Sequence, residues 1–251
     1  MTAQTTPPLA GKAALVTGGS RGIGAAIVRR LAADGADVLF TYASAEAEAQ
    51  KVVAAVEAEG GRAVALRADS ADPQAVRGAV DAAVARFGRL DILVNNAGLI
   101  GMRRPEGYDI DEFDRMYAVN VRAPLVAAEA AQSLMGEGGR IITIGSIVAD
   151  RVGVPGGAIY ASTKGAIAAM TRGLARDYGS KGITINNVQP GPTETDMNPA
   201  DSPHRGWLTA QSPLGRVGQP EEIANLVAFL AGPQSGYING ASLTADGGFT
   251  V

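Results

Sequence analysis

Tyr160 and Lys164 stand four residues apart in a segment of helical spacing, so both side chains project from one face of a helix. A phenol has an ordinary pKa of about 10 and relays protons poorly at neutral pH. A neighbouring ammonium stabilises the phenolate, and we expect Lys164 to lower the pKa of the Tyr160 hydroxyl. The pair predicts an acid/base group acting on a carbinol or carbonyl oxygen. A solvated helix face is the other interpretation of this spacing.

Ser146 strengthens the first interpretation, because it ends a predicted strand. In open α/β sheets the carboxyl ends of the strands are the edge where ligands bind. A loop over residues 148–157 separates Ser146 from the segment that carries Tyr160. This loop leaves the shape of the pocket open.

A glycine-rich stretch, residues 17–24, joins the first predicted strand to the first predicted helix and reads TGGSRGIG. Glycine permits positive φ and lets the backbone approach a pyrophosphate, whose charge is stabilised by free N–H groups at a helix N-terminus. Glycine is also common in turns that bind no ligand. The position in a βαβ unit nevertheless predicts dinucleotide binding.

The composition excludes several classes of protein. The chain has 251 residues, a formal net charge of −3, one His and no Cys. Without cysteine there is no disulfide scaffold, thiol nucleophile or cysteine-bound metal, and we expect no metal site. His204 lies between Pro203 and Arg205 in a polar stretch and is expected to be solvated. The dispersed basic residues argue against nucleic-acid binding.

The hydropathy pattern gives no targeting or membrane signal. No stretch reaches the roughly 18 apolar residues of a membrane span. The first eleven residues lack the basic and apolar regions of a secretion signal. We therefore expect no membrane contact and, by elimination, a cytoplasmic location.

Short aliphatic runs alternate with segments of helical spacing along nearly the whole chain. Seven runs predict strands, at residues 13–17, 38–41, 63–66, 92–94, 141–144, 183–186 and 242–244. Strands that are apolar on both faces and separated by helices predict an α/β fold. The expected architecture is a doubly wound, seven-stranded parallel sheet with helices on both faces, of the Rossmann type.

The predicted organisation is one domain over residues 11–251 after a flexible segment at 1–10. Helices are expected at 45–59, from Asp72-Pro73 and after Pro220, where the capping residues and early carboxylates are typical of helix starts. The one long irregular stretch, 190–220, is interpreted as a lid, the alternative being a surface excursion. Trp207 and Leu208 within it would either form an apolar substrate wall or anchor the loop.

Four motifs in order along the chain resemble those of the short-chain dehydrogenase/reductase family. They are the spacing G-x-x-x-G-x-G from Gly18, the run NNAG at 95–98, Tyr160 with Lys164, and Pro190-Gly191. The resemblance covers almost everything from residue 11 to 251. Within the family the pattern looks closest to bacterial 3-oxoacyl-acyl-carrier-protein reductases and related NADPH-dependent ketone reductases.

The resemblance implies catalytic roles for Asn120, Ser146, Tyr160 and Lys164. Ser146 would polarise the substrate oxygen beside Tyr160, and Lys164 would also bind the nicotinamide ribose. Asn120 would connect Lys164 to solvent through water. The alternative for Asn120 is a polar helix residue that kinks the backbone before Pro124.

The resemblance also implies a set of cofactor contacts. Asp69 and Ser70 would flank the adenine, and Asn95, Ala97 and Gly98 would line the adenosine-ribose side. Thr193 and Thr195 would hold the carboxamide, with transfer of the pro-S hydride; both could equally be turn-forming residues. The amides of Asn95 and Asn96 could instead hold neighbouring strands together. The predicted cofactor-binding residues are Gly18, Ser20, Arg21, Gly22, Ile23, Gly24, Tyr42, Ala43, Ser44, Asp69, Ser70, Asn96, Ala97, Gly98, Tyr160, Lys164, Pro190, Gly191, Thr193 and Thr195.

The end of the second strand predicts which nicotinamide cofactor binds. A carboxylate there would hold the ribose 2′-OH and repel a 2′-phosphate. The position that carries Asp in NAD-selective family members is occupied by Tyr42, while Asp37 lies at the other end of the strand and Glu46 falls in the next helix. Arg21 suits a phosphate, although it could also be a solvated loop charge. We therefore predict NADP(H).

The function that these patterns predict is NADPH-dependent reduction of a ketone, either a 3-oxoacyl thioester or a small ketone, to a secondary alcohol. Tyr160 would protonate the oxygen while hydride is transferred. Sugar or polyol dehydrogenation is the catalytic alternative, and a non-catalytic regulator that senses NADP is the alternative from another class.

The resemblance also implies assembly and docking partners. A homotetramer is implied through the helices that carry Asn120 and Tyr160 and through residues 236–251. The small residues of the helix that carries Tyr160 would pack against a partner or against the chain's own core. A carrier-protein docking patch would use Arg103, Arg104, Arg122 and Arg172, unless these are scattered solvated arginines.

Overall fold

Seven parallel strands form one sheet in this computed structural model, which describes residues 6–101 and 107–251. The order is β3-β2-β1-β4-β5-β6-β7, which confirms the predicted doubly wound, single-domain Rossmann-type fold. The strands are β1 Ala13–Val16, β2 Asp37–Tyr42, β3 Arg62–Arg67, β4 Ile92–Asn95, β5 Arg140–Ile144, β6 Thr184–Pro190 and β7 Ser242–Ala245. The order reverses between β1 and β4, and ligands bind at such a point.

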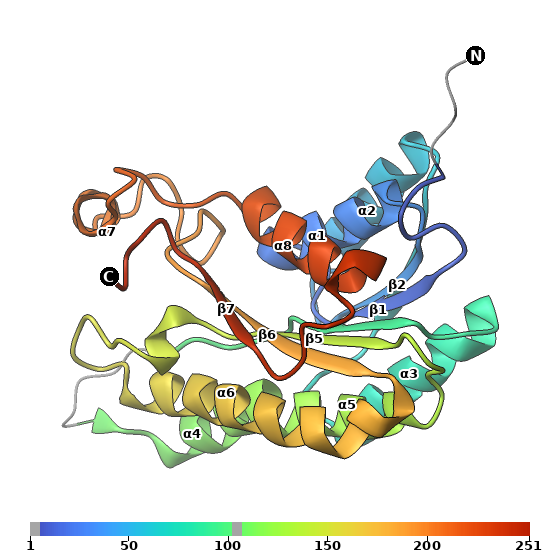
Figure 1. Cartoon of the computed structure of the whole chain (residues 1–251). Helices are drawn as coiled ribbons and strands as arrows, with labels where there is room; N and C mark the ends of the chain where they lie inside the picture. Colours follow the sequence, from blue (N-terminus) through green and yellow to red (C-terminus); the bar gives the residue numbers. More distant parts are fainter. Residues whose placement is uncertain (1–5, 102–106) are drawn as a thin grey trace.

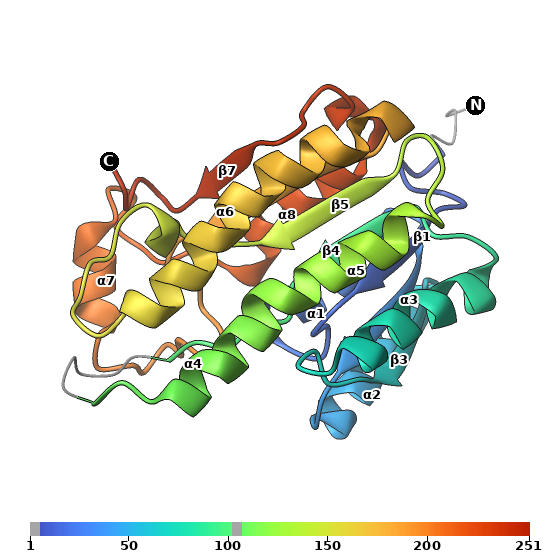
Figure 2. The same ribbon diagram turned by 90° about the horizontal axis from the view of Figure 1, so that it is seen from below.

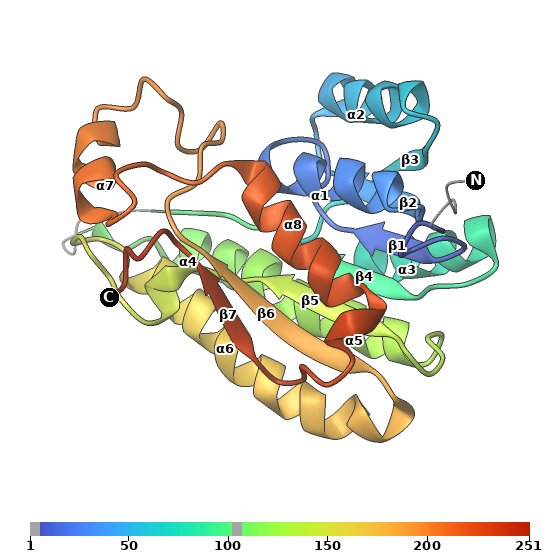
Figure 3. The same cartoon turned by 45° about the horizontal axis from the view of Figure 1, so that its top comes forward.

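Helices cover both faces of the sheet (Figures 1 and 2). One face carries α1 Gly22–Ala33, α2 Glu46–Ala58 and α8 Pro220–Ala231, with α1 and α8 side by side (Figure 3). The other carries α3 Pro73–Phe87, α4 Ile110–Tyr117, α5 Ala123–Gln132 and α6 Ala158–Tyr178. Among the described residues, no helix is both long and apolar enough to cross a bilayer.

Alternation along the strands supplies two apolar cores, one on each face of the sheet. Phe40 and Val94 pack with α1 and α8, whereas their neighbours Leu39 and Leu93 pack with α3 and α5. Successive strand side chains point to opposite faces, so each strand must be apolar throughout. The continuous aliphatic runs of the sequence have this origin.

The predicted helix starts are confirmed at α3 and α8. Asp72 caps α3 by accepting from the Gln74 N–H at 2.8 Å, with proline in the first position of the helix. At α8, Gln219 and Glu222 form a reciprocal capping box, in which Glu222 accepts from the Gln219 N–H at 2.8 Å. These side chains satisfy N–H groups that have no partner inside the helix.

Two expectations about irregular segments are corrected. Residues 190–220 are not irregular throughout, since they contain helix α7, Arg205–Gln211, and a bridge from Thr193 to Gly218. A seven-residue helix without a side-chain cap leaves little trace in the sequence. Leu9, within the segment expected to be flexible, is only 2% exposed and donates its N–H to Asp34 O at 2.9 Å. Leu9 therefore anchors this segment on the domain, whereas residues 6–8 and 10 are exposed.

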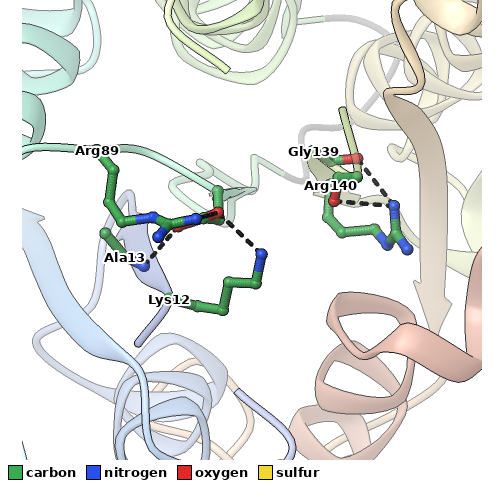
Figure 4. Close-up of polar contacts among 7 residues, drawn as sticks. Lys12, Ala13, Arg89, Gly139 and Arg140 are labelled. Atoms are coloured by element: carbon green, nitrogen blue, oxygen red, sulfur yellow. Dashed lines mark hydrogen bonds and ion pairs between the residues drawn. The ribbon is translucent and has the colours of Figure 1, made fainter. Parts of the chain in front are cut away.

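Asp91 ties together the amino-terminal ends of β1 and β4, at the edge of the sheet opposite the ligand edge. Lys12, Ala13 and Arg89 converge on its carboxylate (Figure 4). Arg89 donates two hydrogen bonds, at 2.7 and 2.6 Å, and the Ala13 N–H donates one at 2.9 Å. Burial alone would raise the pKa of this carboxyl, but the hydrogen bonds from Arg89, Ala13 and Lys12 hold it below its ordinary value.

We expect Asp91→Asn to lower the free energy of unfolding by about 1–3 kcal/mol, because Lys12, Arg89 and the buried Ala13 N–H lose a charged acceptor. The loss would be present above about pH 4 and would shrink as the pH falls through the folded-state pKa, since that pKa is lower than in the unfolded chain. Urea unfolding measures it. The exposed Asp81→Asn on α3 is the matched control and should change stability by no more than about 0.5 kcal/mol. Equal effects would contradict the role of Asp91.

Candidate active site

A cleft of about 1050 Å³ opens at the carboxyl edge of the sheet, between the glycine turn, the start of α6 and the segment around α7. All twenty residues predicted to bind the cofactor line it, as do the predicted catalytic residues Ser146, Tyr160 and Lys164. Asn120 and Asn95 do not line it. One cavity thus brings together predicted residues that are up to 177 positions apart in the sequence, from Gly18 to Thr195.

The glycine turn fits a phosphate-bearing ligand closely. Gly18 and Gly22 have φ of +69° and +52°, where other residues are strained. The first intrahelical bond of α1 runs from Ala25 N–H to Arg21 O, so the N–H groups before it have no acceptor within the helix. The first turn of α1 carries no acidic side chain and no side-chain cap. This end of the helix therefore presents free donors to an anion.

Asn96 holds the turn against β4. Its Nδ2 donates to Thr17 O at 3.0 Å and to Gly18 O at 2.9 Å, while its backbone N–H donates to Thr17 Oγ1 at 3.0 Å. Asn95 instead donates to Thr143 Oγ1 at 3.4 Å inside the sheet. The expectation that Asn95 lines the adenosine side is therefore wrong, because its side chain lies against Thr143 of β5 on one face of the sheet and does not line the cleft.

Gly24→Ala tests the turn. A Cβ there would lie 2.2 Å from Gly18 O and 2.5 Å from Asn96 Nδ2, so the backbone must shift. We expect a loss of about 1–3 kcal/mol of stability and at least about tenfold weaker NADPH binding, measured by fluorescence titration. Gly78→Ala is the control: nothing lies within 4 Å of the new Cβ, and alanine favours the helix by about 1 kcal/mol. Unchanged NADPH affinity in Gly24→Ala would contradict the assignment.

The described lining of the cleft includes two carboxylates, and each is paired. Asp69 accepts from the Ala71 N–H at 2.9 Å and pairs with Arg115 at 3.3 Å. The Ala71 bond is the largest cause that lowers its pKa. Asp196 lies 3.8 Å from Arg21. Asp37 pairs with Arg62 at the far end of β2, which leaves the carboxyl end to Tyr42.

Tyr160, Ser146 and Lys164 meet at the inner end of the cleft. The hydroxyls of Tyr160 and Ser146 lie close enough to interact, and Ser146 also caps the 3-10 helix η3 (Ile147–Ala149). Lys164 is 6% exposed and donates from Nζ to Ile144 O at 2.8 Å. Its Nζ lies 5.6 Å from the centroid of the Tyr160 ring. Two hydroxyls and one ammonium are thus arranged around one point beside the glycine turn.

The expected lowering of the Tyr160 pKa by Lys164 is corrected. Burial raises the pKa of the Tyr160 hydroxyl above its ordinary value, and only the hydrogen bond to Ser146 acts in the opposite direction. Burial also lowers the pKa of Lys164, to about 8. Both shifts have one cause, the loss of water around the charged form. At neutral pH Tyr160 is therefore a neutral phenol able to donate a proton.

Asn120 lies behind the cleft, in a π-helical segment, η2 Ala118–Arg122, between α4 and α5. Its Oδ1 accepts from the Leu99 N–H at 2.8 Å, and its Nδ2 donates to Leu99 O at 2.8 Å and to Thr163 Oγ1 at 3.1 Å. Thr163 in turn donates to Tyr160 O at 2.7 Å. The side chain of Asn120 thus holds these segments together, with both N–H groups of its amide donating. Nothing in the sequence predicted the π-helical turn.

The remaining predicted residues lie around the mouth of the cleft. Thr193 donates from Oγ1 to Gly191 O at 3.0 Å, and the Thr195 methyl group lies against Gly22. Sequence reasoning missed Arg115, Arg151 and Phe249, which also line the cleft. They come from α4, the loop after η3 and the C-terminal segment, and carry no motif of their own. Arg103 and Arg104 of the expected docking patch lie outside the described residues.

This sheet, the uncapped glycine-lined helix start and the Tyr–Ser–Lys group at the same edge define a dinucleotide-binding oxidoreductase. A family model described as Enoyl-(Acyl carrier protein) reductase matches residues 18–250. The chain belongs to the short-chain dehydrogenase/reductase family.

Three relatives illustrate the range of proteins that are similar to the chain. A solved short-chain dehydrogenase from Burkholderia cenocepacia J2315, in complex with NADP, is 52% identical with a TM-score of 0.95, covering 97% of this chain and 100% of that one. A cyclic-di-GMP-binding biofilm dispersal mediator protein of Escherichia coli (strain K12) is 48% identical over 95% of this chain and 97% of its own length. A probable tetrahydroxynaphthalene reductase of Zymoseptoria tritici is 40% identical over 96% of each.

Proposed function

We propose that this protein is an NADP(H)-dependent reductase that converts a ketone to a secondary alcohol. The single observation that carries the proposal is the placement of Tyr160, close to Ser146 and beside Lys164, in the same cleft as the glycine turn. When bound, the nicotinamide supplies hydride to the carbonyl carbon. The protein's own residues must then orient the carbonyl oxygen and give it a proton.

Tyr160 is the proton donor in this proposal. Its raised pKa keeps the phenol protonated at neutral pH, so Oη has a proton to give as negative charge develops on the substrate oxygen. Ser146 holds the same oxygen with a second hydroxyl and stabilises that charge. Lys164, with a pKa of about 8, is close enough to neutrality to exchange protons near the phenol. Asn120 keeps the segment around Leu99 and Thr163 in register with Tyr160.

NADP(H) is the cofactor that the cleft supports best. The glycine turn keeps its shape because Gly24, which has no Cβ, packs directly against Gly18 O and Asn96, and the end of β2 presents Tyr42, Ala43 and Ser44 rather than a carboxylate. Arg21 projects into the same region with its side chain 58% exposed. A 2′-phosphate would find a cation there, beside a strand end that carries no carboxylate, and it would compete with Asp196 for Arg21. The NADP bound to the Burkholderia relative agrees with this choice.

We expect catalytic efficiency, kcat/KM, to be at least about 100-fold higher with NADPH than with NADH. Replacing Arg21 by Gln should lower kcat/KM for NADPH by about tenfold or more, the range of a lost charge-assisted hydrogen bond, and change that for NADH by less than about threefold. Initial rates at 340 nm give both values. A preference for NADH in the wild-type protein would overturn the cofactor assignment.

A substrate screen tests the reaction itself. In the direction of reduction, the purified protein is given NADPH with acetoacetyl thioesters or small aryl ketones. In the direction of oxidation, it is given NADP⁺ with aldoses or polyols. Absorbance at 340 nm is the readout in both assays. Ketone-dependent loss of NADPH supports the proposal. Turnover of sugars alone would favour the polyol dehydrogenase alternative. No turnover with any substrate, together with tight NADPH binding, would favour a regulator of the kind that the name of the E. coli relative suggests.

The assembly that we propose is a homotetramer. A Cβ added at Gly165 would meet nothing within 4 Å, and Ala169 on the same helix, α6, is exposed, so this small-residue face is not covered by the chain itself. Small residues allow two helices to approach closely. Light scattering that gives the mass of a monomer would contradict the tetramer.

A cytoplasmic location stays a prediction.

A further inference from the structure

The substrate end of the cleft carries a cation that the proposed proton transfer does not use. Arg151 follows η3, the short helix that begins after Ser146, and its backbone N–H donates to Ile147 O at 3.0 Å. Its side chain is exposed and lines the cleft. The guanidinium is therefore held on the same short segment as the hydroxyl of Ser146.

Phe249 fixes the position of Arg151 and of the cleft's tryptophan. The Arg151 Cζ lies 5.6 Å from the centroid of the Phe249 ring, and its Nη1 donates to Phe249 O. The Trp207 ring meets the same phenylalanine edge to face, with centroids 6.1 Å apart. Phe249 is itself 5% exposed, in a turn where Asp246 accepts from the Gly248 and Thr250 N–H groups at 2.8 and 2.9 Å.

Trp207 presents a free aromatic surface to the cleft. It is 43% exposed, and it lies against the loop that follows Arg151, 3.5 Å from the position of a Cβ on Gly153. Exposed aliphatic side chains complete this end of the cleft: Leu99, Ile100, Val154 and Met197. A planar, apolar ring fits such a wall better than a polyol does.

The charges in the cleft are distributed unevenly. Arg21 and Arg115 each pair with a carboxylate, Asp196 and Asp69. Arg151 has no ion pair with any residue in the described part of the chain. A guanidinium carries five N–H donors, and in Arg151 only Nη1 donates to Phe249 O, which leaves the other N–H groups for an anion. Beside an apolar wall, an anion brought to it would be screened less by water than at an open surface.

We infer that the substrate is an aryl ketone that bears an anionic group, with Trp207 stacking on the ring and Arg151 pairing with the anion. The inference rests on the proposed ketone reductase function and names the substrate class of that site. Arg151 is then a residue that determines specificity, and it acts on binding of the substrate rather than on proton transfer.

Binding to the NADP⁺ complex tests the inference without turnover. Trp207 is the single tryptophan of the chain, so quenching of its fluorescence reports directly on this end of the cleft. The probes are 4-acetylbenzoate and its uncharged methyl ester, which share the aryl ketone. We expect Arg151→Gln to weaken the acid by about 10- to 100-fold and the ester by less than about twofold. Arg151→Lys should retain part of the preference, and the exposed Arg86→Gln on α3 should change neither affinity.

The results separate the two proposals. Equal weakening of acid and ester, unchanged affinity for the acid, or no quenching by either compound would overturn the role of Arg151. Reduction of the ester by NADPH is measured in parallel at 340 nm. If the ester is reduced while Arg151→Gln shows no selective effect, the inference fails and the ketone reductase function stands. If the acid binds selectively through Arg151 but neither compound is reduced, the proposed reaction fails.

Discussion

Tyr160→Phe should reduce kcat by about 10³-fold or more while the affinity for NADPH and the melting temperature stay close to wild type. The variant removes one hydroxyl, the proposed proton donor beside Ser146, and keeps the ring near Lys164. General acid catalysis contributes about 10²- to 10⁴-fold, and loss of the bond that orients the substrate oxygen adds to this. Single-turnover rates with a ketone that the wild-type protein reduces give the value.

Tyr178→Phe is the matched control, since Tyr178 is another phenol on α6 that lies outside the cleft. Its kcat should stay within about twofold of wild type. A Tyr160→Phe protein with near-normal turnover would end the proposed mechanism, because no other described residue of the cleft brings a phenol beside both Ser146 and Lys164. Equal losses in both variants would instead indicate damage to α6.

Lys164→Met has the second largest expected effect, and it changes both activity and the pH dependence of stability. Activity should fall by about 10²- to 10³-fold, because the ammonium beside Tyr160 is lost. For stability, the folded-state pKa of Lys164 is about 8, against 10.5 for the ordinary side chain. Between these two pKa values, Lys164 is protonated in the unfolded chain but largely deprotonated in the folded protein. The free energy of unfolding of the wild-type protein therefore rises with pH over this range.

The size of that rise follows from the lowered pKa and is about 2–3 kcal/mol between pH 7 and pH 10. Lys164→Met has no group to titrate at this site and should lack the rise. Urea unfolding of both proteins at several pH values measures the difference. Lys51→Met, at an exposed lysine of α2, should keep the wild-type dependence. A Lys164→Met protein with the same rise as wild type would show that Lys164 is not buried as a costly charge.

Much of the site was predictable because the motifs are local. A glycine turn, a Tyr and Lys one helical turn apart and a serine after a strand are each defined by neighbours in sequence, and the alternation of aliphatic runs predicted the sheet that aligns them. The strand carboxyl ends of a parallel sheet share one edge, so the motifs had to meet there. Asn95 was misplaced because adjacent strand residues face opposite ways, which a motif read as a continuous run does not reveal.

The sequence by itself determined the class of fold, the glycine turn and the spacing of Tyr160 and Lys164, because each depends on short-range geometry and on the period of the apolar residues. Only the tertiary structure decided the protonation of that pair. Burial raises the pKa of Tyr160 and lowers that of Lys164, and burial depends on segments that fold over the two side chains from elsewhere in the chain. The same holds for the grouping of Arg151, Trp207 and Phe249, which come together through packing between distant segments and have no pattern in the sequence.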